Sequence, residues 1–177
     1  MDSSLLDKKV LPPSYQATTT TTTSSQPQAT TPMSIPNGGN RNVRNLPLDE
    51  EGKRDWSFDI LDCLGDVDTY CLSCWCPCIA HAHNRRRLLY LNAYGVPHPN
   101  RERIVEGDSV IYAAFEAFFS AGWLLQIFTR GGIRERYNIQ GNGAHDCIAT
   151  FCCQTCDLVQ GSRELRLEEE SFENQRS

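Results

Sequence analysis

Cysteine is the residue type that offers this chain the most chemistry. Nine cysteines occur among its 177 residues, and eight of them fall in two short windows far apart in the sequence. Each window contains a pair three residues apart, Cys71 with Cys74 and Cys153 with Cys156. One turn of backbone can aim two such sulfurs at a single ion, and zinc held by thiolates takes four of them in a tetrahedron. We therefore predict that the fold brings the two windows together around a metal ion.

The predicted ligands come from both windows. Pro77 stands between Cys76 and Cys78 and fixes the backbone angle there, which holds these two sulfurs in a defined relation. His81 and His83 follow closely and could add imidazole nitrogen. Thiolates suit several soft metals, so ligand type does not select one. We expect zinc, or cadmium as a bound toxic metal. The predicted ligands are Cys71, Cys74, Cys76, Cys78, Cys152, Cys153 and Cys156.

Other roles for the cysteines stay open at this point. Free cysteine packs as a small apolar residue, and Cys147, Cys152 and Cys153 stand among Ile, Ala and Phe. Cysteines beside apolar helices can also carry palmitate, and exposed thiols can take part in redox chemistry. The first ten residues carry four charges and no apolar run. We therefore expect a reducing compartment, with thiols or metal ligands in preference to disulfides.

No arrangement of residues typical of an active site accompanies the cysteines. A cysteine nucleophile needs a base within reach, and His81, His83 and His145 offer nothing beyond their residue type. The sequence has no glycine-rich phosphate loop, no paired carboxylates and no serine elbow. We expect a protein that is not an enzyme, with no catalytic residue and no organic cofactor.

Composition divides the chain into three parts. Residues 1–52 are rich in Ser, Thr and Pro, and they carry too few large apolar side chains to offset the entropy of ordering them. Residues 53–167 suit one cysteine-rich domain, and residues 168–177 suggest an acidic, flexible and solvated end. A basic helix is expected over Asn84–Ala93, which Gly95 ends. The predicted fold class is mainly α, a small helical domain with a disordered tail.

The tail contains a short recognition pattern. Pro12, Pro13 and Tyr15 match the ligand of WW domains, because adjacent prolines preset an extended helix that docks on an aromatic groove. Such a motif could recruit a WW-domain ubiquitin ligase. The net charge of −5, with no basic face interleaved with aromatic residues, argues against nucleic acid as a partner.

Val110–Phe128 is the longest apolar run, with Glu116 as its one charge. Its length nearly fits a span of ~20 residues, but a central carboxylate costs on the order of 3 kcal/mol and roughly cancels the apolar gain. A single span would also separate the two cysteine windows by a bilayer. We therefore expect one helix that is buried or lies in the membrane interface, with Glu116 facing protein. Ala113, Ala117 and Ala121 could let a second helix approach, as in a homo-oligomer.

The order of these residues resembles a known family. The pattern comprises Trp56, Asp62-Cys63, Cys71, Cys76-Pro77-Cys78, Arg134–Tyr137, Asn138-Ile139, Gly141, Asp146-Cys147, Cys152-Cys153, Cys156, Gln160 and Arg163-Glu164-Leu165. It resembles the cysteine-rich placenta-specific-eight family, which includes plant cadmium-resistance and cell-number-regulator proteins, and it looks most like the fungal members. Two features depart from the family pattern: Tyr70 replaces the first cysteine of a common Cys-Cys pair, and the segment Tyr94–Arg103 is an insert.

The resemblance implies a membrane-associated protein linked to cadmium or zinc tolerance and transport, to calcium entry, or to control of cell number. We expect a heavy-metal-binding protein on the cytoplasmic side of a membrane, with the plasma membrane favoured. The alternative is a non-catalytic adaptor that regulates growth or the trafficking of a membrane partner through its tail.

Overall fold

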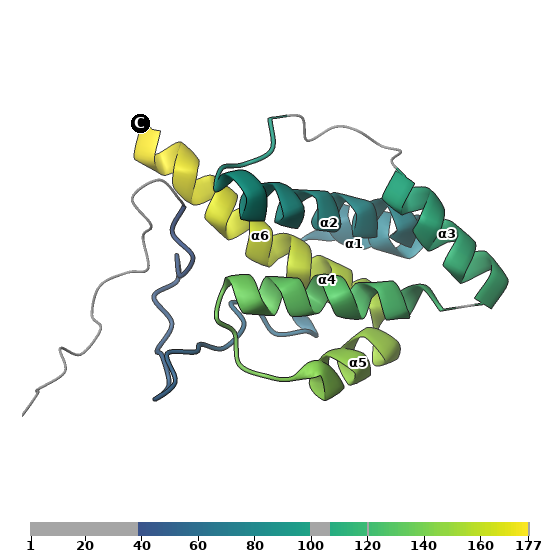
Figure 1. Cartoon of the computed structure of the whole chain (residues 1–177), viewed down its shortest axis with the longest axis horizontal. Helices are drawn as coiled ribbons and strands as arrows, with labels where there is room; N and C mark the ends of the chain where they lie inside the picture. The colour runs from purple at the N-terminus through teal and green to yellow at the C-terminus, as the bar shows by residue number, and fades with distance from the viewer. Residues whose placement is uncertain (1–38, 100–106, 120, 177) are drawn as a thin grey trace, which may run out of the picture. The chain divides into compact units, whose positions relative to one another are not determined.

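The computed structural model describes residues 39–99, 107–119 and 121–176. Within these ranges the chain forms a short 3-10 helix and six α-helices, and an isolated β-bridge pairs Arg54 with Ile139. The mainly α prediction is confirmed. Pro12, Pro13 and Tyr15 lie outside the described residues. The helices are η1 (Asp62–Gly65), α1 (Val67–Trp75), α2 (Pro77–Tyr94), α3 (Gly107–Phe119), α4 (Gly122–Arg136), α5 (Gly143–Cys152) and α6 (Gln154–Arg176) (Figure 1).

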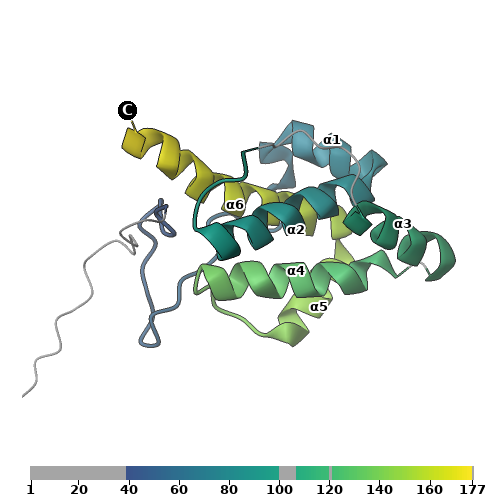
Figure 2. The same ribbon diagram turned by 45° about the horizontal axis from the view of Figure 1, so that its top comes forward.

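Helices α2, α4 and α6 contact one another and enclose the core. Figures 1 and 2 show α2 and α4 side by side, with α6 crossing them. Helix α1 packs on α2 and α6, α3 packs on α2 and α4, and α5 packs on α4 and α6. Each fully buried large apolar side chain stabilises this arrangement by about 1.5–3 kcal/mol. The core residues are Leu88, Leu91, Ile133, Tyr137, Ile139 and Leu165, with Trp56 and Phe172 packed against them.

Local residue chemistry sets the ends of α2. Pro77 occupies the first turn, where its missing N–H leaves no hydrogen bond unmade and its fixed φ suits a helix. Gly95 ends the helix with φ 69°, a left-handed conformation that favours glycine. The helix predicted over Asn84–Ala93 is therefore confirmed, and it begins earlier than expected. Its first turn places Cys76 and Cys78 on either side of the junction with α1.

The apolar run Val110–Phe128 forms two helices, α3 and α4, where one was expected. The Gly122 N–H donates to Glu116 Oε2 at 2.9 Å, so the carboxylate of α3 satisfies a free donor at the start of α4. The expectation that Glu116 faces protein is confirmed. Ala121 lies before α4 and outside α3, so the predicted alanine stripe does not run along one helix. None of the helices in the described ranges has the length and apolar character required to cross a bilayer.

Gly131 and Gly132 follow the apolar run and lie inside α4, which continues to Arg136. A Cβ atom added at Gly132 would come within 2.9 Å of Leu88 Cδ2. The absence of a side chain at Gly132 therefore lets α2 approach α4 closely. Close packing of two helices, and not helix termination, explains this glycine.

Glu168 and Glu169 lie inside α6, and each is 1% exposed. Arg136 donates to both oxygens of Glu168 at 2.8 and 2.6 Å. Arg87 donates to both oxygens of Glu169 at 2.9 Å. The interpretation of this acidic run as solvated surface is therefore wrong for these two residues, because arginines from α2 and α4 supply the opposite charges.

The segment before η1 lies against α6. The Asn40 N–H donates to Ser171 Oγ at 2.8 Å. Arg54 and Glu164 form an ion pair at 2.5 Å, with both side chains 1% exposed, and Ser57 donates to the same carboxylate through its N–H and its hydroxyl. Arg54 also donates to the Arg41 carbonyl oxygen, and this contact and the Arg136–Glu168 pair cross the expected domain boundaries at residues 53 and 168. The boundaries themselves stay predictions.

Candidate thiolate site

Three sulfur atoms from distant parts of the sequence meet at the start of α6. Cys153 precedes α6, Cys156 lies in its first turn, and the two form a disulfide with a Cα–Cα distance of 5.3 Å. The Sγ atom of Cys63, in η1, lies 3.4 Å from Sγ of Cys156, although 93 positions separate them. The Cys156 N–H also points to Cys153 Sγ at 3.3 Å. The N-terminal end of a helix favours negative charge, which suits thiolates at this place.

The disulfide differs from the expected free thiols. Two cysteines three residues apart at the start of a helix have Cα atoms within the range that a disulfide can bridge. The same spacing that predicts a pair of metal ligands therefore also permits oxidation. The pair can therefore exist in two states, as two thiolates that can bind a metal ion or as one disulfide.

Arg163 fixes η1 on α6. Its guanidinium donates to the carbonyl oxygen of Asp62 at 2.6 Å and to the Asp62 carboxylate at 2.8 Å, and it lies 3.7 Å from the centre of the Phe58 ring. Arg163 stands two helical turns after Cys156 on α6. The same helix therefore positions Cys156 directly and Cys63 through the neighbouring Asp62.

Helix α1 brings two further cysteines to the edge of this cluster. A hydrogen bond to Cys74 raises the pKa of Tyr70, and the charges of Cys74, Cys63 and Cys71 act in the same direction. Helix α1 packs on η1, which contains Cys63, and on α6, which contains Cys156. Cys71 and Cys74 are exposed, so they border the cluster on its solvent side. Cys63, which contacts Cys156, lies outside both sequence windows, so the predicted meeting of the two windows around one ion stays a prediction.

The other predicted ligands lie elsewhere on the helices. Cys76 and Cys78 are half-buried at the junction of α1 and α2, and Cys152 is exposed at the end of α5. His81 is buried, and its ring centroid lies 4.8 Å from that of Tyr112. In the described part of the chain, no group of three or more His, Cys, Asp or Glu side chains is arranged to hold a metal ion.

Cys63 is the residue at this site that the sequence reasoning left out of the ligand set. It stands eight positions before the first cysteine window and has no cysteine at short spacing. Its partner is supplied by the tertiary fold, so no local pattern could reveal it. The one available signal was its place in the family-like pair Asp62-Cys63.

Comparisons with known proteins identify the family of this chain. A family model described as the PLAC8 family matches residues 56–164, a range that contains all nine cysteines. The chain is 31% identical over 125 residues to the protein named PLANT CADMIUM RESISTANCE 2 of Arabidopsis thaliana, covering 70% of this chain and 75% of that protein. It is 29% identical over 111 residues to Cell number regulator 10 of Zea mays, covering 63% of this chain and 64% of that protein. No solved structure matches it. The chain belongs to the PLAC8 family.

Proposed function

We propose that this chain is a non-enzymatic protein that binds soft heavy-metal ions, zinc or cadmium, through cysteine thiolates and contributes to metal tolerance or transport. The observation that carries the proposal is the 3.4 Å approach of Cys63 Sγ to Cys156 Sγ. Helix α1, which contains Cys71 and Cys74, packs on η1 and α6. Thiolates gathered from distant parts of a chain suit soft metals. The names of two relatives, PLANT CADMIUM RESISTANCE 1 and 2, support a role in tolerance.

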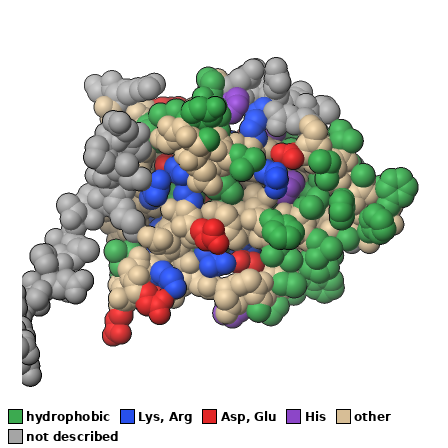
Figure 3. Space-filling view, in the orientation of Figure 1, with side chains coloured by type: hydrophobic (Ala, Val, Ile, Leu, Met, Phe, Trp, Pro, Cys, Tyr) green, Lys and Arg blue, Asp and Glu red, His purple; other side chains and the backbone are tan. Residues whose placement is uncertain are grey.

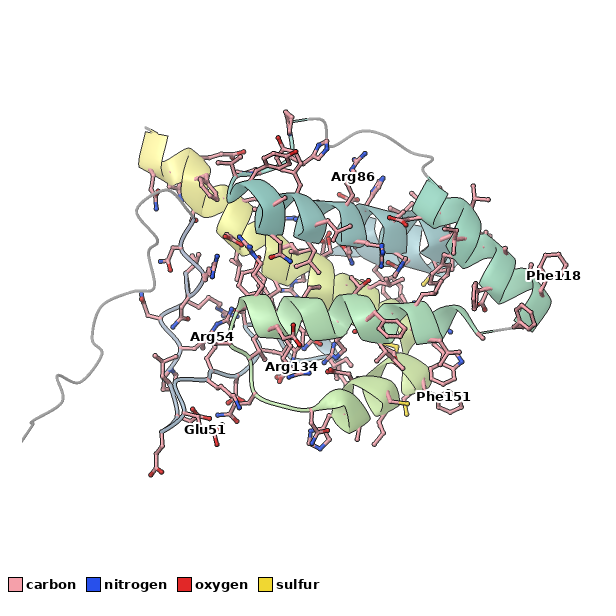
Figure 4. All side chains as sticks on the ribbon, viewed as in Figure 1. Glu51, Arg54, Arg86, Phe118, Arg134 and Phe151 are labelled. Carbon is pink, nitrogen blue, oxygen red and sulfur yellow. A yellow bond between two sulfur atoms is a disulfide. The ribbon has the colours of Figure 1, made fainter. Side chains whose placement is uncertain are left out.

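We also propose that the chain associates with a membrane, and an exposed apolar surface supports this. Figure 3 shows apolar side chains gathered over α3 and the neighbouring parts of α4 and α5. Phe118 of α3 and Phe151 of α5 project away from the helices (Figure 4), and they are 81% and 67% exposed. A surface of this kind suits the boundary between lipid headgroups and acyl chains. The exposed large apolar residues of α3, α4 and α5 are Val110, Ile111, Phe115, Phe118, Phe119, Leu124, Phe128, Ile148 and Phe151.

Replacing both Cys76 and Cys78 by serine tests the ligand assignment at the α1–α2 junction. Serine keeps the size of the side chain but removes the soft thiolate, so the reduced double variant should bind less cadmium per chain than the wild type. Elemental analysis of the reduced, desalted protein measures the difference. Cys147→Ser changes a half-buried cysteine outside the predicted ligand set and serves as the control. Equal metal content in the double variant and the wild type would refute Cys76 and Cys78 as ligands.

A further inference from the structure

The spacing of the three sulfurs at the start of α6 is close to that of metal ligands. Two thiolates on one tetrahedral zinc ion, with bonds of about 2.3 Å, stand about 3.8 Å apart. The Sγ atoms of Cys63 and Cys156 are separated by 3.4 Å. A shift of a few tenths of an ångström would therefore suffice for both to bind one ion, and Cys153 is already joined to Cys156.

The disulfide and a metal ion compete for the same sulfur atoms. A thiol binds metal as its thiolate, and a sulfur in a disulfide carries no such charge. While Cys153 and Cys156 are joined, Cys63 is the one free thiol among these three cysteines and offers a single metal ligand. Reduction would turn Cys153 and Cys156 into two thiolates, with Cys63 Sγ at 3.4 Å from Cys156 Sγ.

We propose that Cys63, Cys153 and Cys156 form a three-sulfur site for a soft metal ion that exists only while the Cys153–Cys156 disulfide is reduced. This inference rests on the proposed function of soft-metal binding, and it adds both Cys63 and redox control to it. A set of thiolates selects ions such as cadmium or cuprous copper over calcium and magnesium, which take oxygen ligands. Cys63 and Cys153 are half-buried, so a small reagent can reach them from solvent.

Oxidation of Cys153 and Cys156 to the disulfide requires an oxidant, and a low-molecular-weight disulfide can supply it. Glutathione disulfide is the probe of this class. The Cys153 and Cys156 thiolates give up two electrons and form one S–S bond. The S–S bond of glutathione disulfide breaks and takes up those electrons, which yields two glutathione thiolates. The metal ion leaves with its charge unchanged. Reduced glutathione at excess runs the same steps in reverse and restores the site.

The test starts from the reduced full-length chain loaded with Cd²⁺. Glutathione disulfide is then added, and a chromophoric chelator reports released cadmium while peptide mapping by mass spectrometry identifies the disulfide. We expect one equivalent of cadmium to be released as the Cys153–Cys156 disulfide forms. The same amount of reduced glutathione, added alone, corrects for binding of cadmium by glutathione itself.

Substitution of the third sulfur separates the metal site from the disulfide. Cys63→Ser should still form the Cys153–Cys156 disulfide. When reduced, it should bind the cadmium ion that oxidation releases from the wild type more than about 100-fold more weakly. Loss of a group that only supports a metal ligand already lowers metal affinity by about 10–100-fold. Cys147→Ser, on α5, should behave as the wild type.

Three results would overturn the proposal and leave soft-metal binding intact. They are a disulfide that forms without release of cadmium, no Cys153–Cys156 disulfide at all, or wild-type affinity for that equivalent in Cys63→Ser. If the reduced wild-type chain binds no cadmium, the three-sulfur site and the proposed function both fall.

Discussion

Replacing Glu164 by alanine should lower the free energy of unfolding by about 3–5 kcal/mol. Arg54 would remain 1% exposed with its positive charge unpaired, and Ser57 would lose an acceptor for both its N–H and its hydroxyl. An uncompensated buried charge is among the costliest single changes in a small domain. Urea unfolding followed by circular dichroism measures the change.

Glu170 provides the matched control for this prediction. It lies on the same helix, α6, but it is exposed. Glu170→Ala should therefore change the free energy of unfolding by no more than about 0.5 kcal/mol. A loss of stability that is equally small for Glu164→Ala would mean that the Arg54–Glu164 pair does not hold the segment before η1 on α6.

His81 should make the domain less stable in acid. Burial lowers the pKa of His81 to about 4, and the charge of Arg85 acts in the same direction while that of Asp108 opposes it. The unfolded chain binds the proton with a pKa near 6.5, so protonation favours unfolding as the pH falls from 6.5 to 4. A shift of this size corresponds to about 3 kcal/mol, which is present at neutral pH and lost near pH 4.

The measurement compares the wild type with His81→Phe, which keeps a ring against Tyr112 and removes the titration. Asp157 titrates in the same range with the opposite sign, because burial raises its pKa to about 6, in spite of its ion pair with Arg130. The prediction therefore concerns the difference in unfolding free energy between the two proteins. That difference should change by about 3 kcal/mol between pH 7 and pH 4. A difference that does not vary with pH would contradict the prediction. The control is His145→Phe at an exposed site, which should show the same dependence of unfolding free energy on pH as the wild type.

Local signals in the sequence predicted the elements that depend on neighbouring residues. Gly95 marks the end of α2 because a left-handed residue closes a helix. Pro77 marks the start of α2 because proline suits the first turn of a helix, and this signal is also visible in the sequence. The break between α3 and α4 was not readable from hydropathy. It depends on Glu116 reaching the Gly122 N–H, a contact between two helices that were expected to be one.

Tertiary contacts explain what the sequence alone misjudged. Three consecutive glutamates suggest solvated surface, yet Glu168 and Glu169 are buried because Arg136 and Arg87 lie opposite them in the fold. The same reasoning applies to the site. The pair Cys153 and Cys156 is visible from spacing, whereas Cys63 joins it only through a fold that spans 93 positions.

X-ray absorption at the cadmium edge tests thiolate binding most directly. The sample is the reduced full-length chain, loaded with one equivalent of cadmium and then desalted. We expect a first coordination shell made of sulfur, with at least three sulfur neighbours. A shell of oxygen and nitrogen alone, or loss of the cadmium on desalting, would contradict the binding of soft metal by converging cysteines.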